Sequence, residues 1–434
     1  MTTETLVTRN SQRTRNPWAW VPSLYVAEGI PYVVAMTVSV IMYKRLGISN
    51  AEIAFYTSWL YLPWVIKPLW SPFVEMFGTK RNWIVVAELV IGGMLAAVAL
   101  TLPLSGFFRY SLAVFWLMAF SSATHDIAVD GFYMLALPQK QQSAFVGIRS
   151  TFYRIAMISG QGALVVLAGY LENHTGGNIR TAWCWSFGAA AVVFIVFCIY
   201  HKIVLPFPVS DGVQRKEGTR RPFEEFVHIF ALFFRKEKIG LVLAFLLLYR
   251  FAEAQLVKLV TPFLLDGNAV GGLGLSTTEV GIVYGTVGIL ALTIGGLLGG
   301  YVISRHGLRF WLWPMVLAIH LPDLVFVYLS QTQPGNLFII NAAVAVEQFG
   351  YGFGFTAYMM YMIMISDGEH KTAHYAICTG IMALGMMLPG MASGVVQEAI
   401  GYKNFFLWIM LSTIPGFIVA SYVKIDPEFG RKTI

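Results

Sequence analysis

The chain has 434 residues, of which 57% are hydrophobic and 12% are charged, whereas soluble globular domains carry about twice that charged fraction. This composition excludes a soluble globular protein and indicates one that crosses a membrane many times. The net charge of +7 does not indicate nucleic-acid binding, because the basic residues are spread over short polar connections and do not form one patch. The three cysteines lie in apolar runs without metal-ligand spacing, so the sequence predicts no disulfide framework, no metal site and no cofactor.

Twelve apolar segments are long enough to cross a bilayer as helices. They lie near residues 18–43, 52–74, 82–104, 109–137, 143–171, 180–205, 239–265, 278–302, 310–330, 336–366, 372–400 and 404–424. The sequence therefore predicts an all-α polytopic membrane protein with twelve transmembrane helices. The long polar connection 206–238 divides them into two pseudo-symmetric six-helix bundles, 18–205 and 239–424, with short tails at 1–17 and 425–434.

The distribution of basic residues predicts which side of the membrane each connection faces. Twenty of the 30 Lys and Arg residues lie in the two tails and in the connections on the same side, and five lie in the opposite connections. The basic side is cytoplasmic, so we expect a multi-pass protein of the inner membrane with both termini in the cytoplasm. Segment 222–236 is amphipathic and is expected either to lie on the cytoplasmic membrane surface as a helix or to belong to a disordered linker.

Two acids and two arginines lie within the fourth and fifth apolar segments. If these segments fold back on one another about Gln139 and Lys140, Asp130 lies opposite Arg149 and Asp126 opposite Arg154. An isolated charge inside a membrane costs at least a few kcal/mol, so opposite charges are expected to pair. The pairs are interpreted either as a charge network that lines a solute path or as structural ion pairs that lock two helices together.

A glycine turn follows the second apolar segment and recurs after the eighth, about 229 residues later. The first turn reads Glu75-Met-Phe-Gly78-Thr-Lys80-Arg81, and the second reads Ser304-Arg305-His306-Gly307-Leu308-Arg309. Repeated halves around a central site are how many transporters build alternating access. The glycines permit a tight turn, and the cations are expected to hold the cytoplasmic side together. The predicted gating residues are Lys67, Glu75, Gly78, Lys80, Arg81, Arg305, Gly307 and Arg309.

These turns resemble the G-x-x-x-D-x-x-G-x-[KR]-x-[KR] signature of the major facilitator superfamily, with Glu75 where Asp is usual and Ser304 in place of the second acid. Three further stretches resemble the AmpG-like muropeptide permeases and the related acetyl-coenzyme A transporters of that superfamily. They are Lys67-Pro-Leu-Trp-Ser-Pro72, Asp126-Ile-Ala-Val-Asp-Gly131 and Tyr153-Arg154 followed by Ser159-Gly160. Glu28 before Gly29 and His125 before Asp126 stand where glutamine is more usual in that branch.

The resemblance implies that helices 1, 4, 7 and 10 line the transport cavity. Counting residues from the helix ends places several ionisable residues of these helices near the middle of the bilayer. The predicted site is the place where these residues lie at the same depth. The predicted substrate and proton-coupling residues are Tyr25, Glu28, Tyr32, His125, Asp126, Asp130, Arg149, Arg154, Arg250, Glu253 and Glu347.

Two roles are possible for several of these residues. Arg250 and Glu253 either serve the solute or neutralise one another, and Glu347 is either protonated or meets a cation from another helix. His125 is either a proton relay or a hydrogen-bonded structural residue. Among other buried ionisable groups, Lys258 is expected to extend toward the outer membrane surface, and structural roles are expected for His320 and Asp323 beside Pro322.

The sequence lacks the G-x-x-x-x-G-K-[ST] loop of ATP-driven machines, so a secondary transporter is expected and not an enzyme. The resemblance implies a monomer that imports an amino-sugar wall fragment, such as an anhydromuropeptide or N-acetylmuramic acid, together with protons. One alternative is an exporter of drugs or metabolites. Another is an intramembrane prenyltransferase that holds Mg²⁺ on Asp126 and Asp130, although such enzymes need a second acidic cluster that the later helices lack.

Overall fold

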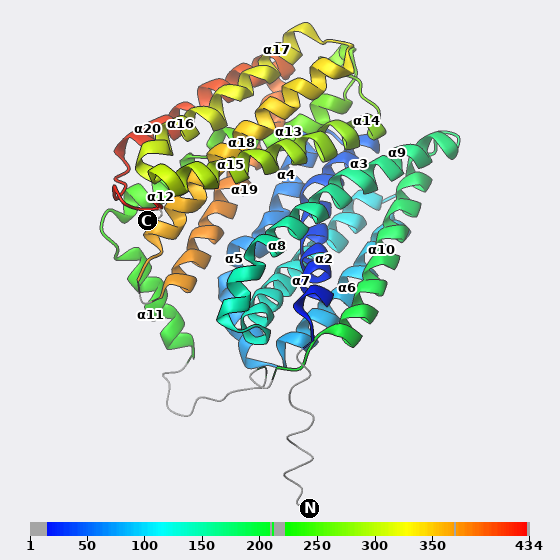
Figure 1. Ribbon diagram of the computed structural model, residues 1–434. Helices are drawn as coiled ribbons and strands as arrows, with labels where there is room; N and C mark the ends of the chain where they lie inside the picture. Colours follow the sequence, from blue (N-terminus) through cyan, green and yellow to red (C-terminus); the bar gives the residue numbers. More distant parts are fainter. Residues whose placement is uncertain (1–14, 209–210, 212–221, 369, 432–434) are drawn as a thin grey trace, which may run out of the picture. The chain divides into compact units, whose positions relative to one another are not determined.

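A computed structural model describes residues 15–208, 211, 222–368 and 370–431, and every regular element in these ranges is helical (Figure 1). The helices of the first half are α2 (Val21–Val33), α3 (Ser39–Arg45), α4 (Asn50–Ser58), α5 (Leu62–Met76), α6 (Lys80–Thr101), α7 (Phe107–Ala136), α8 (Gln139–Met157), α9 (Val165–His174) and α10 (Ile179–Val204). Those of the second half are α11 (Pro222–Phe234), α12 (Ile239–Leu248), α13 (Phe251–Leu265), α14 (Thr277–Ile282), α15 (Ile289–His306), α16 (Leu308–His320), α17 (Leu324–Thr332), α18 (Leu337–Ile365), α19 (Lys371–Ser412) and α20 (Ile414–Tyr422).

The predicted all-helical membrane fold is confirmed. Ten helical stretches in the described ranges are long and apolar enough to span a membrane. One of them, Lys371–Tyr422, contains two predicted segments, because the chain kinks at Gly401 with φ +73°. The predicted segment 52–74 corresponds to α4 and α5, which a 3₁₀ turn at Trp59–Tyr61 separates.

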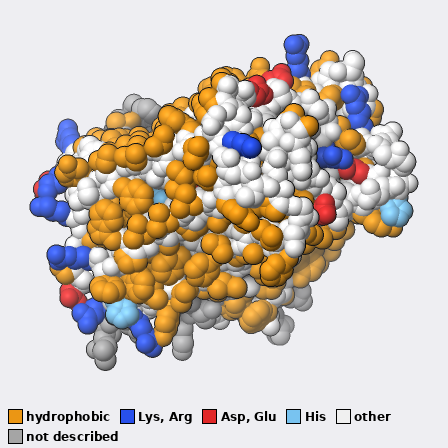
Figure 2. Space-filling view, turned by 90° about the horizontal axis from the view of Figure 1, so that it is seen from above, with side chains coloured by type: hydrophobic (Ala, Val, Ile, Leu, Met, Phe, Trp, Pro, Cys, Tyr) orange, Lys and Arg blue, Asp and Glu red, His pale blue; other side chains and the backbone are white. Residues whose placement is uncertain are grey.

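Large apolar side chains cover much of the surface. Leu100 is 76% exposed and Leu297 is 70% exposed, and Figure 2 shows hydrophobic side chains spread over much of one face, with most Lys and Arg side chains toward its edges. Such a surface is unfavourable in water and favourable against lipid tails. The helices close their own backbone hydrogen bonds, as a segment in hydrocarbon must.

The chain packs as two compact units. Unit 1 comprises the described residues of 1–35, 69–160 and 171–219, and unit 2 comprises the described residues of 36–68, 161–170 and 220–434. Two pieces of the first half, 36–68 and 161–170, therefore pack within unit 2. The core of unit 1 includes Trp20 and Phe132, whose rings meet edge to face at 5.3 Å, and the core of unit 2 includes stacked tyrosines on α12–α13 and α18.

Segment 222–236 forms a helix over most of its length, as one of its two interpretations predicts. Within unit 2, the end of α11 packs on α19, where the buried Phe233 ring meets the His374 ring edge to face at 5.5 Å. Its position on the membrane surface stays a prediction.

The two predicted glycine turns are present. Gly78 has φ +70° between α5 and α6, and Gly307 has φ +83° between α15 and α16. A side chain in this left-handed region costs about 1–2 kcal/mol. A Cβ on Gly307 would also lie 3.3 Å from the carbonyl oxygen of Pro427, so both conformation and space favour glycine there.

Replacing Gly307 tests this reading. We expect Gly307→Ala to lower the free energy of unfolding by about 1–2 kcal/mol, measured as a lower thermal unfolding midpoint in detergent. Gly300→Ala in α15 is the matched control, because a Cβ at that helical position meets nothing within 4 Å. Equal midpoints for the two variants would contradict the turn assignment.

Candidate functional site

In unit 1, Asp130 on α7 and Arg149 on α8 form an ion pair, as predicted from the fold-back of the two segments. The Nη2–Oδ1 distance is 2.6 Å, and the side chains remain 31% (Arg149) and 42% (Asp130) exposed. The Arg149 guanidinium lies over the rings of Tyr25, at 4.6 Å, and Tyr133, at 5.1 Å. The Tyr25 hydroxyl also donates to Asp130, at 3.5 Å. The pair is thus held by aromatic rings but keeps part of its surface open.

Glu28 on α2 lies beside the two predicted acids of α7. Its buried carboxyl group is hydrogen-bonded to the carboxyl group of Asp126, and it lies within electrostatic range of Asp130 and Arg149. A carboxylate can only accept hydrogen bonds, so a bond between two carboxyl groups requires a proton on one of them. A single proton shared by Glu28 and Asp126 would satisfy this contact.

A close approach of α2 and α8 positions Glu28. A Cβ on Gly29 would lie 2.7 Å from the Cβ of Ala156 and 3.2 Å from the carbonyl oxygen of Tyr153, so only glycine permits the two helices to touch here. Tyr153 is partly buried and lies within electrostatic range of Tyr32, Glu28, Asp126 and Arg154.

The second predicted ion pair is Asp126 with Arg154, and these two residues have a neighbour in common. Arg154 and Asp126 share Tyr153 as a neighbour, while Asp126 bonds to Glu28. A direct Asp126–Arg154 contact stays a prediction.

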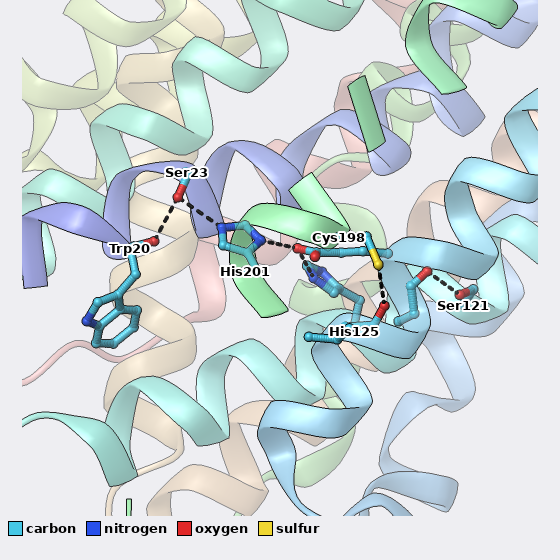
Figure 3. A network of polar contacts seen from close by, with 9 residues as sticks. Trp20, Ser23, Ser121, His125, Cys198 and His201 are labelled. Atoms are coloured by element: carbon cyan, nitrogen blue, oxygen red, sulfur yellow. Dashed lines mark hydrogen bonds and ion pairs between the residues drawn. The ribbon is translucent and has the colours of Figure 1, made fainter. Parts of the chain in front are cut away.

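A second buried polar group lies in unit 1, around Glu88 on α6 (Figure 3). The Oε1 atom of Glu88 lies 2.6 Å from Nδ1 of His201 and 3.4 Å from Nε2 of His125. Nε2 of His201 lies 2.9 Å from the Ser23 hydroxyl, which is also 3.2 Å from the carbonyl oxygen of Trp20. Both imidazoles and the carboxylate are completely buried.

This network decides part of the interpretation of His125. His125 is hydrogen-bonded through Glu88, which links α7 to α6 and, through His201, to α10. Glu88 and His201 are absent from the predicted site. A signal was present, because each is an ionisable residue within a predicted apolar segment, but their partners are distant in the sequence.

In unit 2, Arg250 lies at an interruption between α12 and α13, with φ −108° and ψ 20°. Its guanidinium donates to the Tyr351 hydroxyl and lies 4.7 Å from the centre of the Phe355 ring. Arg250 and Glu253 lie within electrostatic range of each other, and their mutual neutralisation stays a prediction. Both carboxylate oxygens of Glu253 lack a hydrogen-bond partner among the described residues, because Arg250 turns to the aromatic residues of α18.

Glu253 instead lies with Glu347 of α18 and Asp323, which follows Pro322 in the break between α16 and α17. Oxygen atoms from the three carboxyl groups are all within 4.8 Å of one another, and all three residues are buried. The sequence analysis assigns Asp323 a structural role, and the structure places it against two predicted site residues. The resemblance implies that helices 1, 4, 7 and 10 line the cavity, and nothing in the sequence spacing brings Asp323 of the ninth predicted helix to helices 7 and 10.

Lys258 corrects another prediction. The sequence predicts that its ammonium extends to the membrane surface, but the residue is only 2% exposed. Its Nζ atom donates to Thr57 Oγ1 at 3.0 Å and lies 5.1 Å from the centre of the Tyr61 ring, both within unit 2. The ammonium group is therefore part of the interior of unit 2.

Comparison with known proteins places the chain in a family. Residues 24–264, more than half of the chain, match the sequence profile of the Major Facilitator Superfamily. The chain belongs to the Major Facilitator Superfamily. It is thus a secondary transporter and not an enzyme, which excludes the prenyltransferase alternative.

Its similar proteins include AmpG-type transporters. The chain is 25% identical over 416 residues to the putative transporter AmpG 4 of Rickettsia conorii, covering 92% of this chain and 95% of that protein. It is 25% identical over 376 residues to the anhydromuropeptide permease of Escherichia coli, covering 85% and 72%. A crystal structure of a mutant nucleoside transporter, NupG, has a TM-score of 0.71 at 16% identity, covering 93% of this chain and 99% of that one, which shows a shared fold.

The first superfamily turn is tied to the end of α10 and to the following connection in unit 1. The Asp211 carboxylate accepts from the backbone N–H groups of Lys80, at 2.7 Å, and Arg81, at 3.1 Å, which satisfies free donors at the start of α6. The Lys80 ammonium donates to the Val74 carbonyl, and the Arg81 guanidinium donates to the carbonyls of Leu205 and Lys202. Asp211 is absent from the predicted site because it lies in the polar connection.

Lys67, Glu75, Arg305 and Arg309 are the remaining predicted gating residues. In unit 2, Arg305 is exposed and its guanidinium lies over the Tyr301 ring at 4.8 Å, and Arg309 is exposed as well. Lys67 is partly buried in α5, and the side chain of Glu75 lies outside what the structure describes. Gating by any of these residues stays a prediction.

The Glu88 network leads to a stability prediction for this superfamily member. Glu88→Gln keeps the shape of the side chain but removes the charge that two imidazoles share, and the unfolding free energy should fall by about 1–3 kcal/mol. Glu237→Gln is the control, since Glu237 is 90% exposed at 3.9 Å from Lys238 and should leave the unfolding midpoint unchanged. Thermal unfolding in detergent measures both, and an unchanged midpoint for Glu88→Gln would show that the network adds nothing to stability.

Proposed function

We propose that this transporter imports an amino-sugar fragment of the cell wall, of the anhydromuropeptide or N-acetylmuramic acid type, together with protons. It acts as a monomer in the inner membrane with both termini in the cytoplasm. Alternating access comes from rocking of the two six-helix bundles, 18–205 and 239–424. The observation that carries the proposal is the partly exposed Asp130–Arg149 pair between two tyrosine rings, next to the hydrogen-bonded Glu28–Asp126 pair.

The chemistry of this group suits a carboxylated sugar. A guanidinium binds a carboxylate through two parallel hydrogen bonds, and muramic acid differs from other amino sugars in carrying a lactyl carboxylate. The rings of Tyr25 and Tyr133 beside Arg149 offer apolar faces to a sugar ring. The similarity to the anhydromuropeptide permease of Escherichia coli, at 25% identity, supports this class of solute.

Proton coupling follows from charge balance at this site. When the solute carboxylate replaces Asp130 on Arg149, the Asp130 carboxylate loses its cation and lies near Glu28 and Asp126. Two like charges 4 Å apart repel by about 4 kcal/mol at an effective dielectric constant of 20. Uptake of a proton by this group of acids removes that repulsion. The proton offsets the negative charge that the solute adds to the site. The loaded carrier can then reorient across the membrane without exposing an unbalanced charge to hydrocarbon, which is costly.

Uptake into proteoliposomes tests the proposal. Labelled anhydromuropeptide and N-acetylmuramic acid should accumulate under an inward proton gradient, and a protonophore should abolish accumulation. N-Acetylglucosamine, which lacks the lactyl carboxylate, is the matched control and should be excluded, and acetyl-coenzyme A should not enter. Entry of N-acetylglucosamine at the same rate as N-acetylmuramic acid would contradict recognition of the lactyl carboxylate. Uptake that does not depend on the proton gradient would contradict proton symport.

Variants of the ion pair separate a solute role from a structural lock. If Asp130 competes with the solute for Arg149, Asp130→Asn should bind N-acetylmuramic acid about tenfold more tightly, a change of about 1.4 kcal/mol, while its transport loses its dependence on pH. Arg149→Gln should abolish binding.

The double variant Asp130→Asn, Arg149→Gln decides between the two roles. In a structural lock, removing both charges restores transport that either single change impairs. We expect no restoration, measured as uptake rate in proteoliposomes with matched protein content. Recovery to the wild-type rate would contradict the solute role.

A further inference from the structure

The three-carboxyl cluster of unit 2 combines groups from three separate helical segments. Glu253 lies in the first turn of α13, Asp323 ends the 3₁₀ turn Leu321–Asp323, and Glu347 lies within α18. They are 0%, 1% and 2% exposed. One oxygen from each lies within 4.8 Å of the other two. This is the one group of three or more His, Cys, Asp or Glu residues in the described ranges with the spacing of a metal site.

Electrostatic repulsion makes the cluster unstable without a cation. Two carboxylates about 4.8 Å apart repel by about 3–4 kcal/mol at an effective dielectric constant of 20, and three carboxylates make three such pairs. Arg250 lies nearby, but its guanidinium donates to Tyr351 and lies over Phe355. The cluster therefore needs positive charge from outside the chain, either as protons or as a metal ion.

The hydrogen bonds indicate a metal ion. All four oxygens of Glu253 and Asp323 are buried without a partner in the part of the chain that the structure describes, and Glu347 accepts only from its neighbour Gln348, at 3.0 and 3.3 Å. At the observed positions, a proton on Glu253 or Asp323 would be a buried O–H donor without an acceptor in hydrogen-bond range, which costs about 1–3 kcal/mol. A cation between the groups would bind oxygens of all three at once.

The acids of unit 1 show the contrasting arrangement. Glu28 and Asp126 are hydrogen-bonded to each other, as two carboxyl groups are when they hold a proton. In the unit 2 cluster, oxygens of Glu253, Asp323 and Glu347 lie close to one another, but Glu253 and Asp323 have no hydrogen-bond partner. The two groups of acids are thus built for different cations.

The spacing indicates the size of the ion. For three oxygens within 4.8 Å of one another, a point exists that is no more than about 2.8 Å from each. Small inward movements of the side chains then reach the 2.3–2.6 Å of Ca²⁺–oxygen bonds, and Na⁺ has nearly the same radius, whereas Mg²⁺ requires about 2.0–2.1 Å and nearly ideal octahedral geometry. Transporters bind such ions where helices are broken, and Glu253 and Asp323 both lie at helix breaks.

We propose that Glu253, Asp323 and Glu347 bind a partly or fully dehydrated metal cation of the size of Na⁺ or Ca²⁺. The site is separate from the Glu28–Asp126 pair of unit 1. The ion joins α13 and α18 to the break between α16 and α17, so its binding stabilises unit 2.

Thermal unfolding of the full chain in detergent tests this site without any solute, so its outcome is independent of the proposed function. Purified protein is titrated with NaCl, CaCl₂, KCl or MgCl₂ at constant pH and ionic strength, with choline chloride as the balancing salt. We expect Na⁺ or Ca²⁺ to raise the unfolding midpoint saturably by several degrees, because an ion that binds only the folded state stabilises it. KCl and MgCl₂ should have much smaller effects.

Isosteric variants locate the effect. Asp323→Asn and Glu253→Gln should abolish the ion-dependent shift. In ion-free buffer each should unfold at or above the wild-type midpoint, because each removes one repelling charge. Asp367→Asn is the control, an exposed acid of unit 2 that pairs with Lys371 at 3.3 Å, and it should keep the full shift.

Three results would overturn the proposal. They are a midpoint that no metal ion raises, a shift that persists unchanged in Asp323→Asn, and a midpoint that responds to pH alone. Direct binding of radioactive ²²Na⁺ or ⁴⁵Ca²⁺ to immobilised protein gives a second readout for any variant that is too unstable for unfolding measurements. The amount of ion bound by that variant is compared with the amounts bound by Glu347→Gln and by the wild type.

Discussion

The cost of placing an ionised side chain in hydrocarbon is the constraint on which this structure depends. Each unbalanced charge destabilises the protein by at least a few kcal/mol. Every buried acid or base in the described chain therefore needs a group that compensates its charge or a function that requires it. Unit 1 provides three kinds of partner. Asp130 meets a guanidinium, Glu28 meets the carboxyl group of Asp126, and Glu88 is bound by two imidazoles.

The three charged groups of unit 1 differ in how easily an incoming solute can change their contacts. The Glu88 carboxylate and its two imidazoles are completely buried and join α6, α7 and α10, so they stabilise unit 1 whatever the solute does. The Asp130–Arg149 pair is partly exposed, so a solute anion can compete for the guanidinium without first opening the core. Because Glu28 lies within range of both residues of that pair, the exchange of one anion for another changes how tightly its proton is held. Unit 2 has a group of three acids instead, whose missing positive charge points to a bound metal ion.

Sequence reasoning succeeded where a local rule determines the structure. The Asp130–Arg149 pair follows from two segments that fold back at a short turn, and Gly78 and Gly307 follow from the conformation that a tight turn needs. The helical fold follows from twelve apolar segments.

The remaining site residues depend on contacts that sequence spacing does not encode. Glu88 and His201 are 113 positions apart, and Asp211 caps α6 from a polar connection about 130 positions away. Asp323 reaches the cluster only because Pro322 and the 3₁₀ turn break helix 9 there. Lys258 was placed by its distance from a helix end, but packing against Thr57 and Tyr61 buries it.

The most direct test of the central claim counts protons when the solute binds. Purified protein in weakly buffered detergent solution with a pH indicator is mixed with N-acetylmuramic acid. Charge balance at Arg149 and its neighbouring acids predicts uptake of about one proton per solute bound, and none in Asp130→Asn, which has no carboxylate for the solute to displace from Arg149. Solute binding without any proton uptake by the wild-type protein would contradict the account.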